Sequence, residues 1–584
     1  MEVLAAATAR RLSRIRPRSF VAPRTGWVCA GCSLRRDVAS RRWQTSSSTP
    51  PSQPSKPYYI TTPIFYVNAA PHVGHMYSMI LADVLKRWQV LAGRKALLCT
   101  GTDEHGMKVQ KAAAAQDVPP KQLCDTLAAT FQDLAKKTNI DNDFFIRTTD
   151  ADHVAAVEHF WFELKRNDYI YESIHKGWYC VSDECFYPES LIEKKMDPMS
   201  GRVNMVSQET GNVVEWIEEK NYHFRMTALK ERLLHFYKEN PNWLIPASRQ
   251  AEVVDWVTNN LEDLSISRPT ERLSWGIPVP GDPSQTIYVW VDALVNYLTK
   301  AGYPNWTPGQ EDAGGWPVDV HIVGKDIVRF HCVYWPALLM AVGLPLPKNV
   351  LSHGHWTLGR KKMSKSVGNV VNPFFALDRW GVDPMRFFLM LEGQIKHDSD
   401  YSNAAIADRY KKHLQAGLGN LTSRLTRPKT WNVSQVVADV ESTEGLTGNP
   451  VHDDHLRMLE GYHDEVVALM DGLNPRGALQ RVMEVLAQTN KFVSDSAPWS
   501  QDIRPEERTR SVFLAVESLR VSGIFLQAFI PEKAAEMLDL LGVDSARRTL
   551  KDASLHADRT YGKPLRDPGK GMHGLMFPPL AVED

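Results

Sequence analysis

Residues 58–101 restrict the fold more than any other stretch, because two strand patterns enclose a helix pattern there. The segment YYITTPIFYV at 58–67 is β-branched and aromatic, a composition that favours a buried strand. Helical spacing of apolar residues follows over 75–91, Gly93 is placed to end the helix, and ALLCTG at 96–101 is a second strand pattern. A strand, a helix and a strand in this order predict the opening of a parallel α/β sheet with a right-handed crossover.

The whole chain of 584 residues is too long for a single core and divides by pattern into further parts. The α/β rhythm stops over 165–269, which predicts an inserted subdomain, and resumes with TIYVWVDALVNYL and VDVHIVGKDIVRFH. Beyond about Tyr410, amphipathic helical segments predominate, around 454–470, 477–493 and 508–529. We therefore predict an α/β protein with a doubly wound parallel (Rossmann-type) sheet, an inserted connective subdomain and a C-terminal α-helical bundle. The expected parts are a targeting presequence (1–48), a linker (49–57), the first α/β half (58–164), the insert (165–269), the second α/β half (270–350), a region with a lysine-rich loop (351–409) and the helical domain (410–584).

The N-terminal leader has an unusual charge composition. The first 48 residues contain ten arginines, no lysine and only Glu2 and Asp37 as acids. A leader rich in Arg, Ser and Ala is typical of a mitochondrial presequence, and residues 4–18 fit a basic amphipathic helix. The Ser-, Thr- and Pro-rich stretch over 45–57 then predicts a flexible junction. These features predict import into the mitochondrial matrix; the alternative is a disordered RNA-binding arm.

Apolar runs and cysteines limit the class of protein further. No run of about 18 apolar residues occurs, so the sequence predicts no membrane span. Cys29 and Cys32 form a Cys-x-x-Cys pair with no second pair nearby, which indicates an incidental pair rather than a zinc site. The other five cysteines are scattered, as in a protein of a reducing compartment.

A histidine-containing turn joins the first strand to the first helix. In Pro71-His72-Val73-Gly74-His75 the helix N-terminus directs unpaired N–H groups toward any anion beyond the strand ends. Two imidazoles three residues apart can donate hydrogen bonds to phosphate oxygens, and Gly74 lets an adenine or ribose approach the backbone. Taken alone, the same residues could be surface histidines or a metal-binding pair.

A lysine-rich segment lies much later in the chain, in the sequence KKMSKS at 361–366. It is bracketed by Gly359 and Gly368, which suit a mobile loop. Such a loop can bring ammonium groups onto a triphosphate as negative charge develops in the transition state. By itself it could equally be a solvated loop.

Together and in this order, the two motifs resemble the HIGH and KMSKS signatures of class I aminoacyl-tRNA synthetases. His72 to His75 fits the first with Val for Ile, and Lys362 to Ser366 matches the second letter for letter. The segments TTPIFYVNAAPHVGH, GTDEHG, YVWVDALVNY, GKDIVRFH and GNVVNP further resemble the methionyl enzymes, over nearly all of residues 58–584. The resemblance implies an ATP-dependent ligase that forms methionyl-adenylate and charges tRNA(Met) for mitochondrial translation.

The resemblance also implies roles for individual residues. Methionine would be bound by Ile64, Tyr66, Asp103, Trp290, Ile327 and His331. ATP, with Mg²⁺, would be bound by His72, Gly74, His75, Lys362, Ser364 and Lys365, and the catalytic residues would be His72, His75, Lys362 and Lys365. A polarisable thioether favours aromatic walls and a nearby polar tip, such as Tyr66 or His331, and a buried ammonium needs a partner such as Asp103. Each aromatic could otherwise be ordinary core packing.

The inserted region separates this family from its relatives. Leucyl, isoleucyl and valyl enzymes carry a large editing domain, for which the gap between Glu104 and Arg268 is too short, and no Cys/His set fits the zinc-bound pocket of cysteinyl enzymes. Many methionyl enzymes hold a zinc knuckle in the insert. At the matching places this chain has Cys180-Val181-Ser182-Asp183 and Asp197-Pro198-Met199-Ser200, with Cys185 out of phase. One thiolate, two carboxylates and a hydroxyl are a poor zinc set, so we expect no structural zinc.

The helical C-terminal part resembles the anticodon-binding domain of the family. Asn420 and Arg424 are four residues apart on one helix face, and Trp499 follows Pro498 at a helix boundary. In the family, such an Asn and Arg contact base edges and the Trp stacks on a base of the CAU anticodon, as single-stranded loops are read. The alternative is a surface pair and an anchoring Trp. No appended oligonucleotide-binding barrel follows, so we expect a monomer.

Two other classes of protein share parts of the pattern. A small-molecule adenylyltransferase has an HxGH motif but no need of a helical C-terminal domain. A catalytically inactive RNA-binding relative is expected to lack a signature His or Lys, whereas all are present here. Amino-acid-dependent pyrophosphate exchange distinguishes these classes.

Overall fold

The computed structural model describes residues 56–196, 201–306, 310–363, 369–428, 430–441, 448–567, 569 and 574–580. The expected presequence, 1–48, and most of the expected linker lie outside the described residues. None of the described helices is long and apolar enough to cross a membrane.

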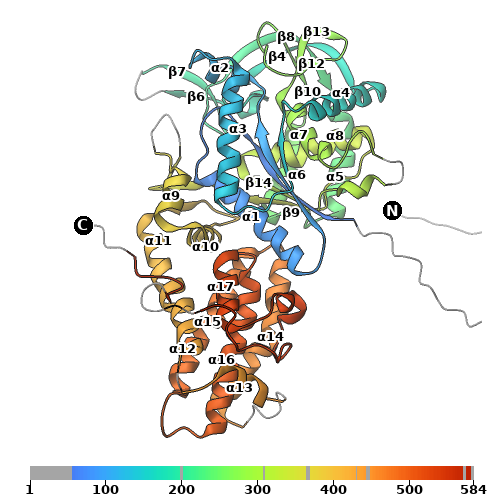
Figure 1. The fold of residues 1–584 in the computed structure, drawn as a ribbon. Helices are drawn as coiled ribbons and strands as arrows, with labels where there is room; N and C mark the ends of the chain where they lie inside the picture. Colours follow the sequence, from blue (N-terminus) through green and yellow to red (C-terminus); the bar gives the residue numbers. More distant parts are fainter. Residues whose placement is uncertain are drawn as a thin grey trace, which may run out of the picture. The chain divides into compact units, whose positions relative to one another are not determined.

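A six-stranded sheet forms the centre of the α/β part (Figure 1). The strand order is β3-β2-β1-β14-β15-β9, and every neighbouring pair is parallel. The strands are β1 (Tyr58–Tyr66), β2 (Ala96–Asp103), β3 (Phe144–Arg147), β9 (Leu244–Ile245), β14 (Val320–Gly324) and β15 (Val350–His353). The predicted parallel Rossmann-type sheet is therefore confirmed, and its order reverses between β1 and β14.

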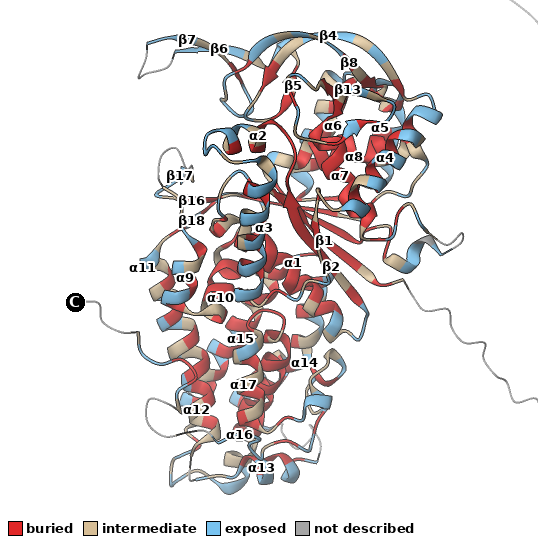
Figure 2. Cartoon of the chain, turned by 45° about the horizontal axis from the view of Figure 1, so that its top comes forward, coloured by how far each residue is buried: buried red, intermediate tan, exposed pale blue. Residues whose placement is uncertain are grey.

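Alternate residues of these strands enter two different hydrophobic cores. Ile60 and Leu98 pack on one face of the sheet, whereas their neighbours Tyr59 and Cys99 pack on the other. This alternation is the period-2 pattern of a strand that is buried on both faces, and Figure 2 shows the strands as buried. Burial on both faces of the sheet explains why residues 58–67 are mostly β-branched and aromatic.

Helices cover both faces of the sheet. One face packs on α1 (Val73–Leu91) and α10 (Val382–Glu392), and the other packs on α4 (Ala151–Arg166), α7 (Val289–Thr299) and α8 (Trp335–Val342). The remaining helices of this part are α2 (Met107–Ala114), α3 (Pro120–Lys137) and α9 (Pro373–Trp380). Helix α1 begins two residues before the start of the predicted helix and ends at the predicted residue.

The inserted region is mainly antiparallel. A long ribbon of β4 (Ile170–Cys180) and β8 (Glu215–Phe224) is extended by β5 (Cys185–Tyr187) and β10 (Leu264–Ser265). A separate hairpin is formed by β6 (Ile192–Met196) and β7 (Val203–Ser207). At the end of the expected insert, β11 (Ser267–Pro269) pairs with β13 (Asp282–Ile287), and β13 pairs with β12 (Pro278–Val279), so this small antiparallel sheet extends beyond residue 269. The region also holds α5 (Lys230–Glu239) and α6 (Ala247–Asn260).

Strand β9 shows that the inserted region is not independent of the central sheet. Its residues lie within the expected insert, yet Leu244 and Ile245 pair in parallel with Val350 and Leu351 of β15. The segment leading to β9 is held by Trp243, whose indole N–H donates to the Pro347 carbonyl at 2.7 Å. The insert therefore contributes the last strand of the sheet.

The C-terminal part is helical, as predicted. Its helices are α11 (Asn403–Arg409), α12 (Asn420–Thr426), α13 (Val433–Asp439), α14 (Pro450–Asp471), α15 (Pro475–Ser496), α16 (Pro505–Leu526) and α17 (Pro531–Leu541). A π-helical segment, Tyr410–Gly419, joins α11 to α12. Between the sheet and this part, β16 (Trp356–Leu358) pairs with β17 (Lys361–Lys362) and β18 (Ser399–Tyr401). Figure 1 shows these helices gathered beside α1 and α10, away from β4 and β8.

Candidate active site

A cavity of about 590 Å³ opens at the carboxyl ends of β1 and β14. Ile64 and Tyr66 line it from β1, and Gly324 and Asp326 line it at the end of β14. The sheet order reverses between these two strands, and such a reversal is where open α/β sheets bind ligands. The fold thus places a ligand-sized cavity at the expected edge of the sheet.

The N-terminus of α1 borders the cavity with two stacked imidazoles. His72 caps the helix: its Nδ1 accepts from the Gly74 N–H at 3.1 Å, and the Nδ1 of His75 accepts from the His72 N–H at 3.1 Å. The two rings stack with centroids 3.7 Å apart. Because each Nδ1 accepts a hydrogen bond, the proton of each neutral imidazole is on Nε2. Both rings are therefore set as N–H donors, the role expected for contacts with phosphate oxygens.

Gly74 makes space inside the turn. A Cβ added at Gly74 would lie 2.9 Å from Cε1 of the His72 ring. Any larger residue would displace the imidazole that caps the helix. Gly74 also lines the cavity, so its predicted role of admitting an adenine or ribose to the backbone stays a prediction beside this contact with His72.

Aromatic rings form the wall of the cavity that the sequence analysis assigned to a methionine side chain. Trp290 stacks on Phe330 with centroids 3.7 Å apart and meets Tyr66 and His331 edge to face at 6.3 and 6.2 Å. The Tyr66 hydroxyl and the Trp290 indole N–H are buried and have no hydrogen-bond partner among the described residues. Burial, with Glu184 and Asp103 nearby, raises the pKa of Tyr66 well above its ordinary value, so the phenol stays protonated. The wall thus combines apolar rings with two unpaired donors.

His331 is locked as a neutral imidazole. Its Nδ1–H donates to the Ile327 carbonyl at 2.9 Å, and its Nε2 accepts from the Tyr297 hydroxyl at 2.7 Å. Burial lowers the pKa of His331 to about 4. Of the two polar tips that the sequence analysis considered, His331 already uses both nitrogens, whereas Tyr66 retains an unpaired hydroxyl.

Asp103 lies at the end of β2 with one oxygen unpaired. Its side chain is 2% exposed and lines the cavity, and Oδ1 has no hydrogen-bond partner among the described residues. Burial, followed by the charges of Asp292 and Glu184, raises the pKa of Asp103 well above its ordinary value. A cation in the cavity would remove this penalty, so the site favours a ligand that carries an ammonium group.

Polar contacts hold the loop after Asp103 in place. The buried Glu104 carboxylate accepts from the Arg147 guanidinium at 2.6 and 2.9 Å. The next residue, His105, bonds Asp292 at 2.7 Å, and Asp292 also bonds His153 at 2.7 Å. The two imidazoles hold the pKa of Asp292 below its ordinary value in spite of its burial. The loop therefore places Asp103 on a rigid support.

The lysine-rich segment reaches the same cavity. Lys362 belongs to β17, which pairs with β16, and the following residue, Met363, lines the cavity with His72 and His75. Residues 364–368, which include Ser364 and Lys365, lie outside the described residues. The two signatures, almost 300 residues apart in the sequence, thus converge on one cavity.

The three anticodon candidates lie in the helical part. Arg424 of α12 places its guanidinium 5.1 Å from the Trp499 ring centroid, and Trp499 is 47% exposed. Asn420 is exposed at the first residue of the same helix, one turn before Arg424. Arg508 of α16 holds the turn on which Trp499 lies, because it donates to the carbonyls of Pro498 and Ser500. The structure therefore brings Arg424 and Trp499 together in a cation–π contact.

The knuckle positions do not form a zinc site among the described residues. Asp183 accepts hydrogen bonds from Tyr187, Thr210 and Asn212 at 2.6–2.9 Å, so its carboxylate is committed to a turn of the insert. No group of three or more His, Cys, Asp and Glu residues in the part of the chain that is described could hold a metal ion. Residues 197–200 lie outside that part.

Several cavity residues were missed by the sequence analysis. His353 at the end of β15 bonds the Ser78 hydroxyl of α1 at 2.9 Å, and the Lys108 ammonium lies 4.2 Å from the Tyr66 ring centroid. His353 could have been found, because it follows a buried strand at the edge where ligands bind. Ser78 and Lys108 carry no such signal, since only the packing of α1 and α2 brings them to the cavity.

Comparisons with known proteins agree with this site. A family model described as tRNA synthetases class I (M) matches residues 58–426. The probable mitochondrial methionine–tRNA ligase of Neurospora crassa is 55% identical, covering 100% of this chain and 96% of the relative, and the mitochondrial methionine–tRNA ligase of Homo sapiens is 41% identical over 89% and 90%. A solved Mycobacterium tuberculosis methionyl-tRNA synthetase in complex with methionyl-adenylate is 38% identical, with a TM-score of 0.80 over 90% of this chain and 100% of that chain.

Proposed function

The chain belongs to the methionyl family of class I aminoacyl-tRNA synthetases, and from this premise we propose how its residues activate methionine with ATP and transfer it to tRNA. The observation that carries the proposal is the single cavity lined by His72, His75, Asp103 and Met363. This cavity brings together imidazoles that can donate hydrogen bonds to phosphate oxygens, a carboxylate that can accept from an ammonium group, and the residue at which the lysine-rich segment begins to line it.

Methionine is held by its two ends. The ammonium pairs with Asp103, whose unpaired Oδ1 supports this role, and the thioether lies against Tyr66 and Trp290. Ile64, Ile327 and His331 complete the pocket. Because His331 uses both nitrogens within the protein, the Tyr66 hydroxyl is the better donor to sulfur.

ATP is bound on the side of α1. The Nε2–H groups of His72 and His75 donate to phosphate oxygens, and the helix N-terminus adds its positive end. We assign to Lys362 and Lys365 the neutralisation of the departing pyrophosphate, and to Ser364 a contact with ATP. Class I synthetases use ATP with Mg²⁺, and the ion bound with ATP would supply positive charge beside the phosphate oxygens.

Two displacements complete the reaction. A methionine carboxylate oxygen attacks the α-phosphorus in line, a new P–O bond forms, and the bond to the bridging oxygen of pyrophosphate breaks. The 2′-hydroxyl of the terminal adenosine then attacks the carbonyl carbon of the adenylate; its proton is lost and AMP leaves. Neither step needs a covalent enzyme intermediate, so catalysis rests on positioning and charge stabilisation.

The helical part recognises the tRNA. We assign the CAU anticodon to Asn420, Arg424 and Trp499; the exposed indole of Trp499 beside Arg424 supports base stacking there. The enzyme acts as a monomer, which light scattering of the purified protein tests. Several relatives are named mitochondrial, and we assign residues 1–48 to import into the matrix. Fusion of residues 1–57 to a reporter protein tests that assignment.

Pyrophosphate exchange with each of the twenty amino acids tests the proposed reaction. Methionine alone is expected to stimulate ATP–pyrophosphate exchange, and the chain is then expected to charge tRNA(Met). Exchange that is independent of amino acids would favour an adenylyltransferase, and no exchange with any amino acid would favour a non-catalytic RNA-binding protein.

A further inference from the structure

Helix α10 presents two opposite charges to the ends of two helices in the C-terminal part. Arg386 is fully buried; its guanidinium donates to the Phe529 carbonyl at 2.9 Å and to the Ala528 carbonyl at 3.2 Å, just beyond the end of α16. One turn earlier, Asp383 accepts from the Lys533 backbone N–H near the start of α17 at 2.6 Å. A cation at a helix C-terminus and an anion at a helix N-terminus both satisfy unpaired backbone groups and complement the helix dipoles.

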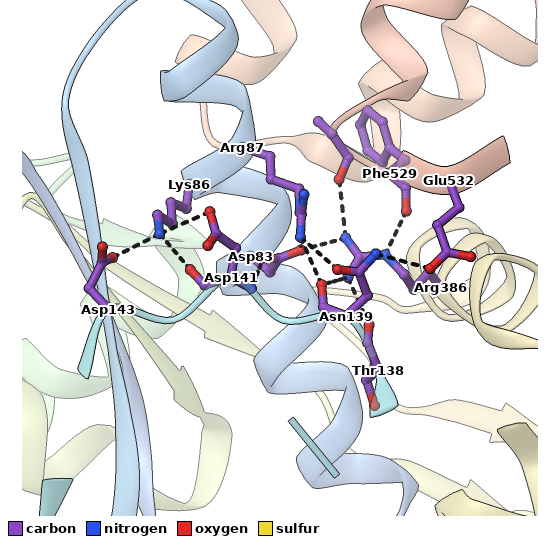
Figure 3. Close-up of polar contacts among 11 residues, drawn as sticks. Asp83, Lys86, Arg87, Thr138, Asn139, Asp141, Asp143, Arg386, Phe529 and Glu532 are labelled. Atoms are coloured by element: carbon purple, nitrogen blue, oxygen red, sulfur yellow. Dashed lines mark hydrogen bonds and ion pairs between the residues drawn. The ribbon is translucent and has the colours of Figure 1, made fainter. Parts of the chain in front are cut away.

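The same Arg386 is bound to helix α1. Its Nη2 lies 2.6 Å from Oδ2 of Asp83, and both side chains are completely buried (Figure 3). Asp83 lies on the helix whose N-terminus carries His72 and His75, roughly 16 Å along the axis from His72. One guanidinium thus connects the phosphate-binding helix directly to the turn between α16 and α17.

Arg386, Asp83 and Asp383 together form a polar node, and a third segment contacts it. Arg386 also donates to the carbonyls of Thr138 and Asn139 at 3.2 and 3.3 Å, in the turn that leads from α3 to β3. Arg87 of α1 holds the same turn, with bonds to Asn139 and to Asp83. Figure 3 shows these side chains converging from α1, the turn and the C-terminal helices.

The geometry of this node determines orientation more than it determines stability. A buried ion pair gives up its hydration, so its net contribution to folding is small. Apolar contacts near the node, such as that between the Trp88 and Phe525 rings with centroids 5.8 Å apart, are non-directional and do not impose one orientation on the helices. Five hydrogen bonds from one planar guanidinium to three segments restrict the angle between those segments far more strongly.

We propose that Arg386, with Asp83 and Asp383, is a positioning residue that fixes the C-terminal helices against α1, so that a tRNA held at Arg424 and Trp499 delivers its acceptor end to the cavity. This inference rests on the proposed anticodon role of the helical part. It assigns to the node a function in the transfer step and none in methionyl-adenylate formation, because no residue of the node lines the cavity.

Three variants test the proposal. Arg386→Met removes the guanidinium and its five hydrogen bonds. Asp83→Leu combined with Arg386→Met removes both fully buried charges and leaves the partly exposed Arg87 without its Asp83 partner. Arg87→Met is the matched control, since Arg87 bonds Asp83 and Asn139 and makes no hydrogen bond to the described residues of the C-terminal helices. For each variant we would measure pyrophosphate exchange and the kcat/KM of charging two tRNAs, one with a CAU anticodon and one with a single anticodon base replaced. The ratio of the two kcat/KM values is the anticodon discrimination.

Both node variants are expected to keep exchange within about twofold of the unmodified protein. Their charging of CAU tRNA should fall at least tenfold, and their discrimination between the two anticodons should fall at least tenfold, while Arg87→Met retains the discrimination. A merely structural role would not change the discrimination ratio.

Two outcomes would overturn the proposal. One is an unchanged anticodon ratio in the double variant, which would show that apolar packing alone sets the geometry. The other is a parallel loss of exchange and charging in both node variants, which would make the node a support of the cavity. If the unmodified protein charged both tRNAs equally, the anticodon assignment itself would be refuted, and this inference with it.

Discussion

Replacement of Asp103 by asparagine separates the charge of this side chain from its size. Asp103 is 2% exposed and its Oδ1 has no partner among the described residues, so the ligand ammonium is its natural counterion. Loss of one member of a buried ion pair costs about 3–5 kcal/mol. Because burial, Asp292 and Glu184 raise the pKa of Asp103, part of the interaction is used to ionise the carboxyl group. We therefore expect a loss of about 3–4 kcal/mol, roughly 10²- to 10³-fold in kcat/KM for methionine.

The assay is methionine-dependent pyrophosphate exchange of Asp103→Asn at saturating ATP. The control ligand is 4-(methylthio)butyrate, which is methionine without its amino group, used as a competitive inhibitor. Its inhibition constant is expected to stay within about threefold in the variant, because the thioether pocket is intact and no ammonium is present. Equal losses for methionine and for the deaminated ligand would refute the ion pair and indicate that Asp103 supports the shape of the pocket.

Three further predictions concern other parts of the chain. Lys365→Ala is expected to lower exchange by orders of magnitude while methionine binding, measured by calorimetry, stays nearly unchanged; unaltered exchange would refute its role at the phosphates. Trp499→Ala should lower tRNA charging by about 1–3 kcal/mol, roughly 5- to 150-fold, with exchange unaffected, and equal losses in both assays would exclude a base contact. Burial raises the pKa of Asp383 to about 6 from its ordinary 3.8, so the folded state binds this proton more tightly than the unfolded state and stability falls as pH rises between about 4 and 6. Asp383→Asn removes this titration. As the pH rises from about 4 to 6, the free energy of unfolding of the variant should therefore increase by about 1–3 kcal/mol relative to that of the parent protein, measured by chemical denaturation at several pH values.

The fold and much of the cavity follow from local patterns. The strand over 58–67 and the helix after it are encoded by residue type and spacing, and the position of His72 and His75 at the strand–helix junction predicts where ligands gather. The convergence of the lysine segment on the same cavity could be anticipated only from the resemblance to a family.

What the sequence did not reveal depends on contacts between distant segments. The close approach of the His72 ring to Gly74, which also lines the cavity, is a detail set by the rotamer of that imidazole. The locking of His331 by Tyr297 requires the relative placement of α7 and the segment after β14. Arg386 has no motif at all, because its five acceptors come from three separated parts of the chain.

The pairing of β1 with β14 has a consequence for how the chain is made. Ile60 meets Val320 in the finished sheet, and β9, one of the two edge strands, pairs with β15 at Val350. A chain that emerges from its N-terminus therefore carries one open edge of β1 until some 260 further residues have followed. Such distant pairing is slow and leaves strand edges open to association with other chains. We therefore expect chaperones to bind a chain of which no more than about the first 353 residues have emerged, because β15, which ends at His353, then has not yet joined the sheet.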